Sequence, residues 1–435
     1  MKVRLEVKKG ADKGKVFEFT GHDIFLFGRS ELAKCHLAND NFVSRFHFLM
    51  EINPPKVWLK DLGSKNGTFV NGVKYGGRIV PDPHDLGMKK LPPSDAGNNH
   101  NSILFETEIF NDDEICVGDN SIYVTVRNNR KPYERSLKSE SDSYGLDIES
   151  LLNIVSTGKP DVISAIPDYE IVRKIGEGGM GTVYLARGLV SSGNVAIKII
   201  KPEQELNQKI VKRFREREMV IVKSLEHKNI THCFDVDFRN GLYYIVMEYI
   251  NGNDIQQIIT RKGPFGVQEA CRIIVETLEG LSYLHTHNII HRDIKPSNII
   301  ISKDNKVKIT DFGLAKDITN TNSLTKSSEY AGTYPFMPPE QLYNFKHCNF
   351  STDVFSVGAT LYYMCTKKYP HDYPKGKDVM LVNIQDPVIP VENRGVKIKQ
   401  EIADVINKAV SLKMNERYQT AKEMQQALIE AVSII

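Results

Sequence analysis

The stretch His291-Arg292-Asp293-Ile294-Lys295-Pro296-Ser297-Asn298, with Asp311-Phe312-Gly313 shortly after it, sets two carboxylates, a carboxamide and a lysine between apolar runs. Asp293 can accept a proton from a hydroxyl group. Asn298 and Asp311 offer hard oxygen ligands of the kind that Mg²⁺ takes beside phosphate oxygens, and phosphoryl transfer requires mainly such positioning and charge neutralisation. A polar turn between two buried strands would use some of these residue types, but the complete string with the second motif makes that alternative negligible.

These two motifs resemble the catalytic loop and the metal-binding loop of protein kinases. The resemblance implies that Asp293 is the catalytic base and that Asn298 and Asp311 hold the metal. Lys295 resembles the lysine of serine/threonine kinases that reaches the transferred phosphate, whereas tyrosine kinases differ at this position. The resemblance runs from about residue 168 to residue 433, and every chemically required position in it is filled.

A glycine loop at residues 176–183 lies between two expected strands rather than before a helix. This placement favours a lid over nucleotide phosphates and argues against a dinucleotide site. Lys198 follows in an apolar strand, where a buried charge is costly unless it is paired. The expected partner is Glu218 on a helix over residues 204–225. Glu216 is the alternative, because either glutamate could instead pair with arginines on the helix surface.

The apolar run over residues 242–249 is by itself a buried strand, but its position resembles the hinge between the lobes of a kinase. Backbone groups of Glu248 and Ile250 would then bind the adenine edge, with Met247 at the back of the pocket. The resemblance assigns catalysis to Asp293, Lys295, Lys198 and Glu218. It assigns nucleotide binding to Gly176, Glu177, Gly178, Gly181, Val183, Ala196, Lys198, Met247, Glu248, Ile250, Asn298 and Asp311.

A serine- and threonine-rich stretch follows Asp311 and resembles a kinase activation segment, with Pro338 where alanine is more usual. Arg292, directly before the base, is a cation that a phosphorylated residue of this segment could meet. The alternative is a flexible solvated loop. Both interpretations hold if the segment is mobile until it is phosphorylated. The phosphorylation candidates are Thr319, Thr321, Thr325 and Thr333.

Later segments have expected structural roles. A helix near residues 267–287 carries a core face, and its histidines, His285 and His287, have no expected function. Arg417 is expected to pair with Glu340 and so to anchor the end of the activation segment.

Residues 1 to about 130 alternate apolar and polar residues over many short segments separated by Gly, Asn, Asp and Pro, which is typical of a β-sandwich. Clusters at residues 28–30, 44–47 and 63–68 resemble a forkhead-associated (FHA) domain, which binds phosphothreonine peptides through charge-assisted hydrogen bonds. Arg29 and Ser44 would contact the phosphate, Arg45 and Lys65 would add positive charge, and Asn66 would hold the peptide backbone. Asn71 is a weaker candidate, and His47 is expected to brace the loops.

Two segments depart from compact folding. Residues 81–101 are rich in Pro, Gly, Asn and Asp, and we interpret them as a disordered insertion between late strands. Residues 131–167 form a polar linker with a short amphipathic helix expected over 147–156, which either docks on a neighbour or stays transient. A flexible linker of about 40 residues spans roughly 35 Å, enough for the FHA domain to meet its own kinase domain or to hold another protein.

Length, net charge, apolar stretches and cysteine spacing limit the remaining classes of function. A chain of 435 residues is expected to form two or three domains, and a net charge of +3 gives no argument for nucleic acid. No apolar stretch long enough to span a membrane and no signal peptide is expected. The six cysteines lack paired spacing and are interpreted as reduced thiols of a cytoplasmic protein.

The sequence thus predicts a multidomain protein: an all-β FHA sandwich at residues 1–130, the linker at 131–167, and an α+β bilobal kinase domain at 168–435, with lobes at 168–248 and 252–435. The resemblance is to bacterial serine/threonine kinases of eukaryotic type. It implies an autophosphorylating signalling enzyme that uses ATP and Mg²⁺, with Mn²⁺ as a substitute, acts on proteins, and binds phosphothreonine in a partner or in its own kinase domain. A homo-oligomer is compatible with the sequence. The alternative is a phosphothreonine-reading scaffold with an inactive kinase-like domain.

Overall fold

The computed structural model describes residues 2–20, 23–53, 56–77, 106–127, 166, 168–178, 181–189, 193–200, 223–239, 242–311, 334–343, 348–374 and 377–433. Several predictions lie outside these residues: the insertion at 81–101, the helix at 147–156 with most of the linker, Glu216 and Glu218, and the four candidate threonines. The domain boundaries stay predictions.

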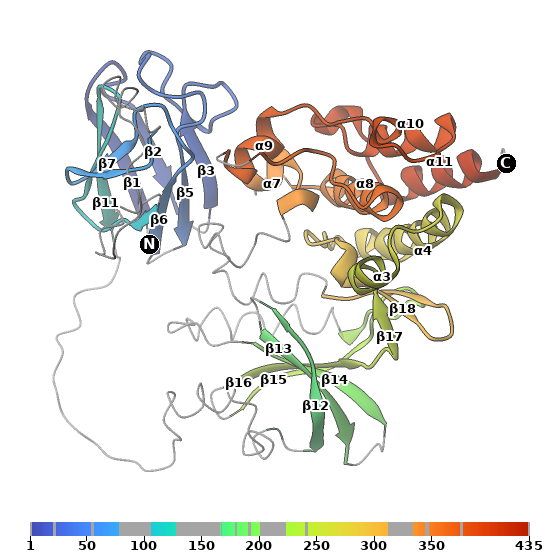
Figure 1. Ribbon diagram of the computed structural model, residues 1–435. Helices are drawn as coiled ribbons and strands as arrows, with labels where there is room; N and C mark the ends of the chain where they lie inside the picture. The colour runs from blue at the N-terminus through green and yellow to red at the C-terminus, as the bar shows by residue number, and fades with distance from the viewer. Residues whose placement is uncertain are drawn as a thin grey trace, which may run out of the picture.

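The N-terminal region is a sandwich of two sheets, as its alternating sequence predicts (Figure 1). The first sheet has the order β2-β1-β11-β10-β7-β8, and the second has the order β4-β3-β5-β6-β9. The strands are β1 (Lys2–Lys9), β2 (Val16–Phe19), β3 (Asp23–Gly28), β4 (Cys35–His36), β5 (Phe48–Asn53), β6 (Lys56–Asp61), β7 (Thr68–Val70), β8 (Val73–Tyr75), β9 (Glu106–Glu108), β10 (Glu114–Val117) and β11 (Asn120–Arg127).

The core of the sandwich lies between these sheets. Alternate residues of each strand point inward, and Phe25 and Phe27 of β3 stack there against Phe19 and Phe48. The opposite residues of β3 are also buried, so that all six positions of this strand are shielded from solvent. The second sheet is therefore covered on both faces.

The kinase-like region begins with an antiparallel sheet of order β12-β13-β14-β16-β15. Its strands are β12 (Tyr169–Gly178), β13 (Gly181–Gly188), β14 (Asn194–Ile200), β15 (Cys233–Arg239) and β16 (Leu242–Glu248). The glycine loop joins β12 to β13. Gly181 pairs with Ile200, and a Cβ atom there would collide with the carbonyl oxygen of Ile199. Glycine is thus required where the loop approaches the next strand.

A helical lobe follows, with a small sheet of order β17-β18-β19 at its edge (Figure 1). The strands are β17 (Gly252–Asp254), β18 (Ile299–Ser302) and β19 (Val307–Ile309). The α-helices are α3 (Ile255–Lys262), α4 (Val267–Thr286), α7 (Pro339–Tyr343), α8 (Phe350–Thr366), α9 (Val379–Gln385), α10 (Gln400–Ala409) and α11 (Ala421–Ser433). The 3₁₀ turns are η3 (Pro296–Asn298), η4 (Tyr334–Phe336), η6 (Val391–Arg394) and η7 (Met414–Glu416).

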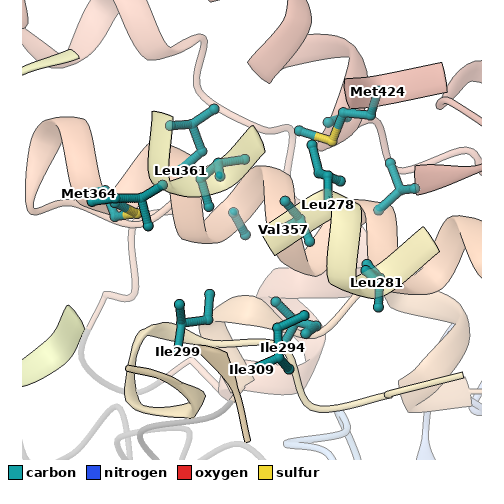
Figure 2. Close-up of a cluster of buried hydrophobic side chains, with 14 of the residues drawn as sticks. Leu278, Leu281, Ile294, Ile299, Ile309, Val357, Leu361, Met364 and Met424 are labelled. Atoms are coloured by element: carbon teal, nitrogen blue, oxygen red, sulfur yellow. The ribbon is translucent and has the colours of Figure 1, made fainter. Parts of the chain in front are cut away.

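The core of this lobe supports the catalytic stretch. Figure 2 shows Leu278 and Leu281 of α4 with Val357 of α8 and Met424 of α11. Ile294, between Asp293 and Lys295, is 1% exposed in the same cluster. Burial of a side chain of this size stabilises the fold by about 1.5–3 kcal/mol. Residue 294 therefore fixes the backbone that presents its polar neighbours to the cleft.

Candidate functional site

A cleft of about 670 Å³ lies between the kinase-like sheet and the helical lobe. It gathers residues from the glycine loop, β14, the end of β16, the catalytic stretch and the metal-binding motif. Of the residues predicted for catalysis and nucleotide binding, the structure brings together Gly176, Glu177, Gly181, Val183, Ala196, Lys198, Met247, Glu248, Ile250, Asp293, Lys295, Asn298 and Asp311. Gly178 ends β12 and is not among the lining residues, and Glu218 lies outside the described part of the chain.

An ion pair spans the cleft. Lys198 on β14 is 6% exposed, and its Nζ lies 2.8 Å from Oδ1 of Asp311. A buried ammonium group needs such a partner, since desolvation otherwise outweighs the gain from packing. Asp311 has a φ of 61°, which a residue other than glycine rarely adopts. A strained backbone thus aims this carboxylate at the lysine.

Asp293 is held in a hydrogen-bonded cluster inside the cleft. Its Oδ2 lies 3.1 Å from Nζ of Lys295 and accepts a hydrogen bond of 3.0 Å from Nδ2 of Asn298, which also donates to the Asp293 carbonyl oxygen at 2.9 Å. The Oδ1 atom of Asn298 accepts only a long contact of 3.5 Å from Ser297 Oγ, and it is the amide oxygen that could face a metal. These contacts fix the relative positions of the carboxylate, the ammonium group and the carboxamide.

The backbone of the catalytic stretch rests on Asp353 of α8. Its two carboxylate oxygens accept hydrogen bonds from the backbone N–H groups of His291 (2.8 Å) and Arg292 (2.7 Å), and His285 Nε2 lies 2.9 Å from Oδ2. Full burial would by itself raise the pKa of Asp353, but the hydrogen bond and charge of His285, together with the charge of His291 and the hydrogen bond from the Arg292 N–H, outweigh burial and keep the pKa below its usual value. No function was expected for His285 from its position in an apolar helix.

The strand ahead of the hinge positions the back of the cleft. Register pairs Ala196 of β14 with Met247 of β16, which places both at the same depth. The Glu248 side chain is turned to Lys308, 2.7 Å away, and its backbone N–H donates to the His232 carbonyl. The side chain of Glu248 is thus engaged elsewhere, as expected if only its backbone serves an adenine edge.

The cleft also includes residues that the sequence analysis did not select: Thr231, Asp254, Ile300 and Thr310. Asp254 caps α3 by accepting a hydrogen bond from the Gln257 N–H. An aspartate directly before a helix can be recognised as a cap from the sequence alone. Thr231, in contrast, reaches the cleft only through tertiary packing. Among the residues that the structure describes, no group of three or more His, Cys, Asp or Glu side chains could hold a metal by themselves.

The second candidate site consists of three loops of the sandwich. Arg29 and Arg45 are exposed, and Arg29 Nη1 donates to Asn41 Oδ1 at 3.1 Å. Ser44 Oγ accepts the backbone N–H of Lys65 at 3.0 Å, which ties two of the loops together. Asn66 donates to the carbonyl oxygen of Phe42 at 2.8 Å. The residues predicted to bind phosphothreonine therefore lie on adjoining loops.

Buried hydrogen bonds of His47 and Asp61 stabilise these loops. His47 is fully buried; its Nδ1 accepts the Ser44 N–H and its Nε2 lies 3.1 Å from the Gly67 carbonyl oxygen. Burial lowers the pKa of His47 against the opposing charge of Asp61, so the neutral ring with its proton on Nε2 fits both contacts. Asp61, which the sequence analysis missed, accepts hydrogen bonds from Ser64 and Thr68.

Two other sequence expectations have clear outcomes. Asn71 donates a hydrogen bond to the Asp113 carboxylate and accepts one from the backbone N–H of Glu114. This is a structural role at a turn. Arg417 pairs with Glu340 at 2.7 and 2.9 Å, both residues being buried, and this confirms the predicted anchor. Across the described residues, none of the helices has the length and apolar character needed to span a bilayer.

Comparison with known proteins agrees with this geometry. The model of the protein kinase domain family matches residues 169–429, and that of the FHA domain matches residues 25–87. The serine/threonine-protein kinase PrkC of Bacillus subtilis is 33% identical over 59% of this chain and 39% of its own length. The corresponding figures for the serine/threonine-protein kinase PknB of Mycolicibacterium smegmatis are 35%, 60% and 42%. The chain thus spans about two fifths of the length of these curated relatives.

Among solved structures, the crystal structure of Rad53 residues 1–466 in complex with AMP-PNP aligns with a TM-score of 0.50 and 21% identity. The alignment covers 98% of this chain and 99% of that one, and it supports the fold alone. The predicted fold class, an all-β FHA sandwich followed by a bilobal kinase fold, is confirmed. The chain belongs to the protein kinase domain family, with an FHA domain on the N-terminal side of its kinase domain.

Proposed function

We propose that this chain is a serine/threonine protein kinase that transfers the γ-phosphoryl group of ATP to hydroxyl groups of proteins, including its own. The observation that carries the proposal is the convergence of Lys198, Asp293, Lys295, Asn298 and Asp311 on one cleft. An inactive kinase-like scaffold would be expected to lack one of the lysine, base or metal-binding positions, and here each of them faces the cleft.

Each residue has a part in the proposed transfer. The glycine loop lies over the phosphates of the nucleotide, and Lys198 neutralises their charge. Asp293 orients the substrate hydroxyl and receives its proton, while Lys295, 3.1 Å from that carboxylate, steadies the group in transit. Such a base contributes about 10²–10⁴-fold to rate.

The donor set of the cleft fits a divalent metal. Asp311 and Asn298 supply a carboxylate and an amide oxygen, and Mg²⁺ is commonly bound by one or two protein groups together with substrate phosphates. A bound Mg²⁺ or Mn²⁺ would neutralise charge on the phosphates. Asp311 also contacts Lys198, so this residue would connect the metal to the lysine.

The FHA domain is proposed to bind phosphothreonine through Arg29 and Ser44, with Arg45 and Lys65 adding charge. Its target is a phosphorylated partner or the phosphorylated kinase domain of the same protein. The support is the cluster of exposed cations on loops that are hydrogen-bonded to one another. Charge-assisted hydrogen bonds of this kind are about twice as strong as neutral ones.

The enzyme proposal is tested with purified protein, Mg²⁺, labelled ATP and a generic basic protein. Wild type should transfer label, and Asp293→Asn should lower the rate by at least about 10²-fold. Asp304→Asn, an exposed aspartate in the turn before β19, is the matched control and should keep wild-type activity. Absence of transfer by wild type after activation has been attempted would support the scaffold instead.

A further inference from the structure

The second sheet of the FHA domain has an apolar face directed away from the sandwich core. While Phe25 and Phe27 of β3 point into the core, Ile24 and Leu26 point to the opposite face, where both are at most 2% exposed. Register places Leu26 beside Leu49 of β5, and Leu49 beside Lys60 of β6. Because a solvated sheet face normally carries polar side chains at these positions, this face is suited to a partner.

The partner in the structure is the helical lobe of the same chain. The apolar side chains of this sheet face form one buried cluster with Tyr334, Met337, Leu342, Met380 and Ile384. These residues come from η4, the turn after it, α7 and α9, and Figure 1 shows β3 on the side of the sandwich nearest α7 and α9. Leu26, Leu49 and Leu342 are each fully buried.

Charged groups fix the register of this contact. Lys60 is 6% exposed, and its Nζ lies 3.5 Å from Oδ2 of Asp378, the residue that caps α9. A buried lysine without a carboxylate partner would be costly, so the FHA domain and the helical lobe supply complementary charges. Burial and the nearby charges of Asp378, Glu106 and Glu51 raise the pKa of Tyr334, which places FHA carboxylates close to a tyrosine of the helical lobe.

The covered segment is already held by its own lobe. Glu340 pairs with Arg417, and Asn383 of α9 donates to the carbonyl oxygens of Tyr334 at 2.5 Å and Met337 at 3.3 Å. These polar anchors do not involve the FHA domain. The FHA domain therefore shields this surface from solvent, while bonds within the helical lobe hold the segment in place.

The covered segment also adjoins the catalytic stretch. Leu342 of α7 faces the FHA sheet, and its neighbour Gln341 donates to the Arg292 carbonyl oxygen at 2.7 Å, directly before Asp293. A protein that presents a hydroxyl group to Asp293 must approach beside this surface. A short peptide needs less of the surface than a folded protein does.

The same contact reaches the phosphate-binding loops. Each of the three loops has one apolar residue in the shared cluster: Ala33 after Ser30, Phe46 after Arg45, and Leu62 before Ser64. The loops that carry the proposed phosphothreonine site are thus part of the surface that meets the helical lobe.

We propose that the outer face of the β3-β5-β6 sheet is an interaction surface for the kinase lobe of its own chain, and that this docked arrangement slows phosphorylation of protein-sized substrates. The proposal rests on the proposed kinase activity for its second half only. Its first half concerns the shape of the molecule and can be tested without catalysis.

The test compares full-length wild type with Leu26→Asp on the FHA side and Ile384→Asp on the lobe side. Val73→Asp, at an exposed position of the other sheet, is the matched control. Small-angle scattering should show a larger radius of gyration for the two interface variants and no change for the control. Retained binding of a phosphothreonine peptide by Leu26→Asp shows that its sandwich is folded, and Ile384→Asp tests the same contact with the sandwich unaltered.

For activity, kcat/KM is measured with a folded protein substrate and with a short peptide. Both interface variants should raise the value for the protein about tenfold, which corresponds to about 1.4 kcal/mol of docking free energy, and leave the peptide value unchanged. The inference would be overturned if the interface variants phosphorylate the peptide but keep the wild-type radius of gyration and the wild-type kcat/KM for the protein substrate. A wild-type dimer that these variants dissociate would also overturn it, because the partner would then be a second copy. No transfer to either substrate by any form would count against the kinase activity and leave the scattering result to decide the docking.

Discussion

Asp353 lies outside the cleft and holds the backbone directly before Asp293. Its carboxylate accepts two backbone N–H groups of the catalytic stretch and meets His285. In Asp353→Asn an amide nitrogen replaces one acceptor, which leaves a buried donor facing another donor, a cost of about 1–3 kcal/mol. We expect kcat to fall at least about tenfold, with a smaller change in KM for ATP.

Steady-state kinetics and thermal unfolding check this expectation, with Asp304→Asn as the exposed control. A variant with wild-type kcat and a lowered melting temperature would mean that Asp353 stabilises the fold without positioning Asp293.

His371 gives a pH dependence of stability. Burial is the main cause that lowers its pKa to about 4 from 6.5, and the side chain is 3% exposed. Between these values the unfolded chain binds a proton that the folded chain does not, so stability is complete above about pH 6.5 and falls as the pH decreases toward 4. The slope is about 1.4 kcal/mol per pH unit.

Urea unfolding at pH 7.5 and pH 5 measures this loss. His371→Gln should flatten the pH dependence, whereas His287→Gln, at an exposed position, should retain it. Identical pH profiles for wild type and His371→Gln would exclude His371 as the cause.

At this scale the sequence predicted most of the residues that line the cleft but not those that support them. Asp293, Asn298 and Asp311 are recognisable because their spacing along the chain is short. His285 and Asp353 are 68 residues apart, and Asp61 acts through a loop whose geometry no local pattern specifies. Such pairs depend on packing between elements, which composition and periodicity do not encode.

At the scale of elements, α8 and α10 approach closely at Gly358. A Cβ atom there would lie 2.7 Å from Cβ of Ala409 and 3.1 Å from Cγ1 of Val410. Alanine gains about 1 kcal/mol of helix propensity over glycine, but overpacking a core typically costs 1–3 kcal/mol. We therefore expect Gly358→Ala to lower the free energy of unfolding by about 1 kcal/mol.

Gly266 provides the opposite case. It precedes α4 with no side-chain cap, and nothing lies within 4 Å of the place a Cβ would occupy. Gly266→Ser should be neutral or stabilising by a few tenths of a kcal/mol. Chemical denaturation of both variants compares them, and a stabilising Gly358→Ala would show that the helices separate at little cost.

Element type was largely predictable, whereas element contacts were not. Alternation of apolar and polar residues gave the strands of the sandwich, and the apolar spacing over residues 267–287 gave α4. In β3 every residue is buried, because Ile24 and Leu26 face the helical lobe. Sequence alone reads such a strand as apolar on both faces but does not name what covers the second face.

At the scale of the whole molecule, one chain combines a proposed writer and a proposed reader of phosphothreonine. Autophosphorylation would create a ligand for Arg29 and Ser44. We expect Arg29→Ala to lose binding to the phosphorylated kinase domain, because the phosphate loses its main charged donor. Lys13→Ala, an exposed lysine in the turn between β1 and β2, should bind as wild type does.

A pull-down of phosphorylated kinase domain on immobilised FHA domain variants measures this binding, with Leu26→Asp present in every variant to remove the phosphate-independent docking contact. Undiminished binding by Arg29→Ala would exclude capture through these loops, and binding that persists after phosphatase treatment would exclude phosphothreonine as the ligand.

If Asp293 is the base of an active serine/threonine kinase, its substitution should abolish autophosphorylation. The most direct measurement is phosphosite mapping by mass spectrometry of dephosphorylated wild type and Asp293→Asn after incubation with ATP and Mg²⁺. We expect phosphate on threonine or serine residues of wild type and none on Asp293→Asn. Equal phosphorylation of the two proteins, or none on wild type or on an added basic protein, would contradict it.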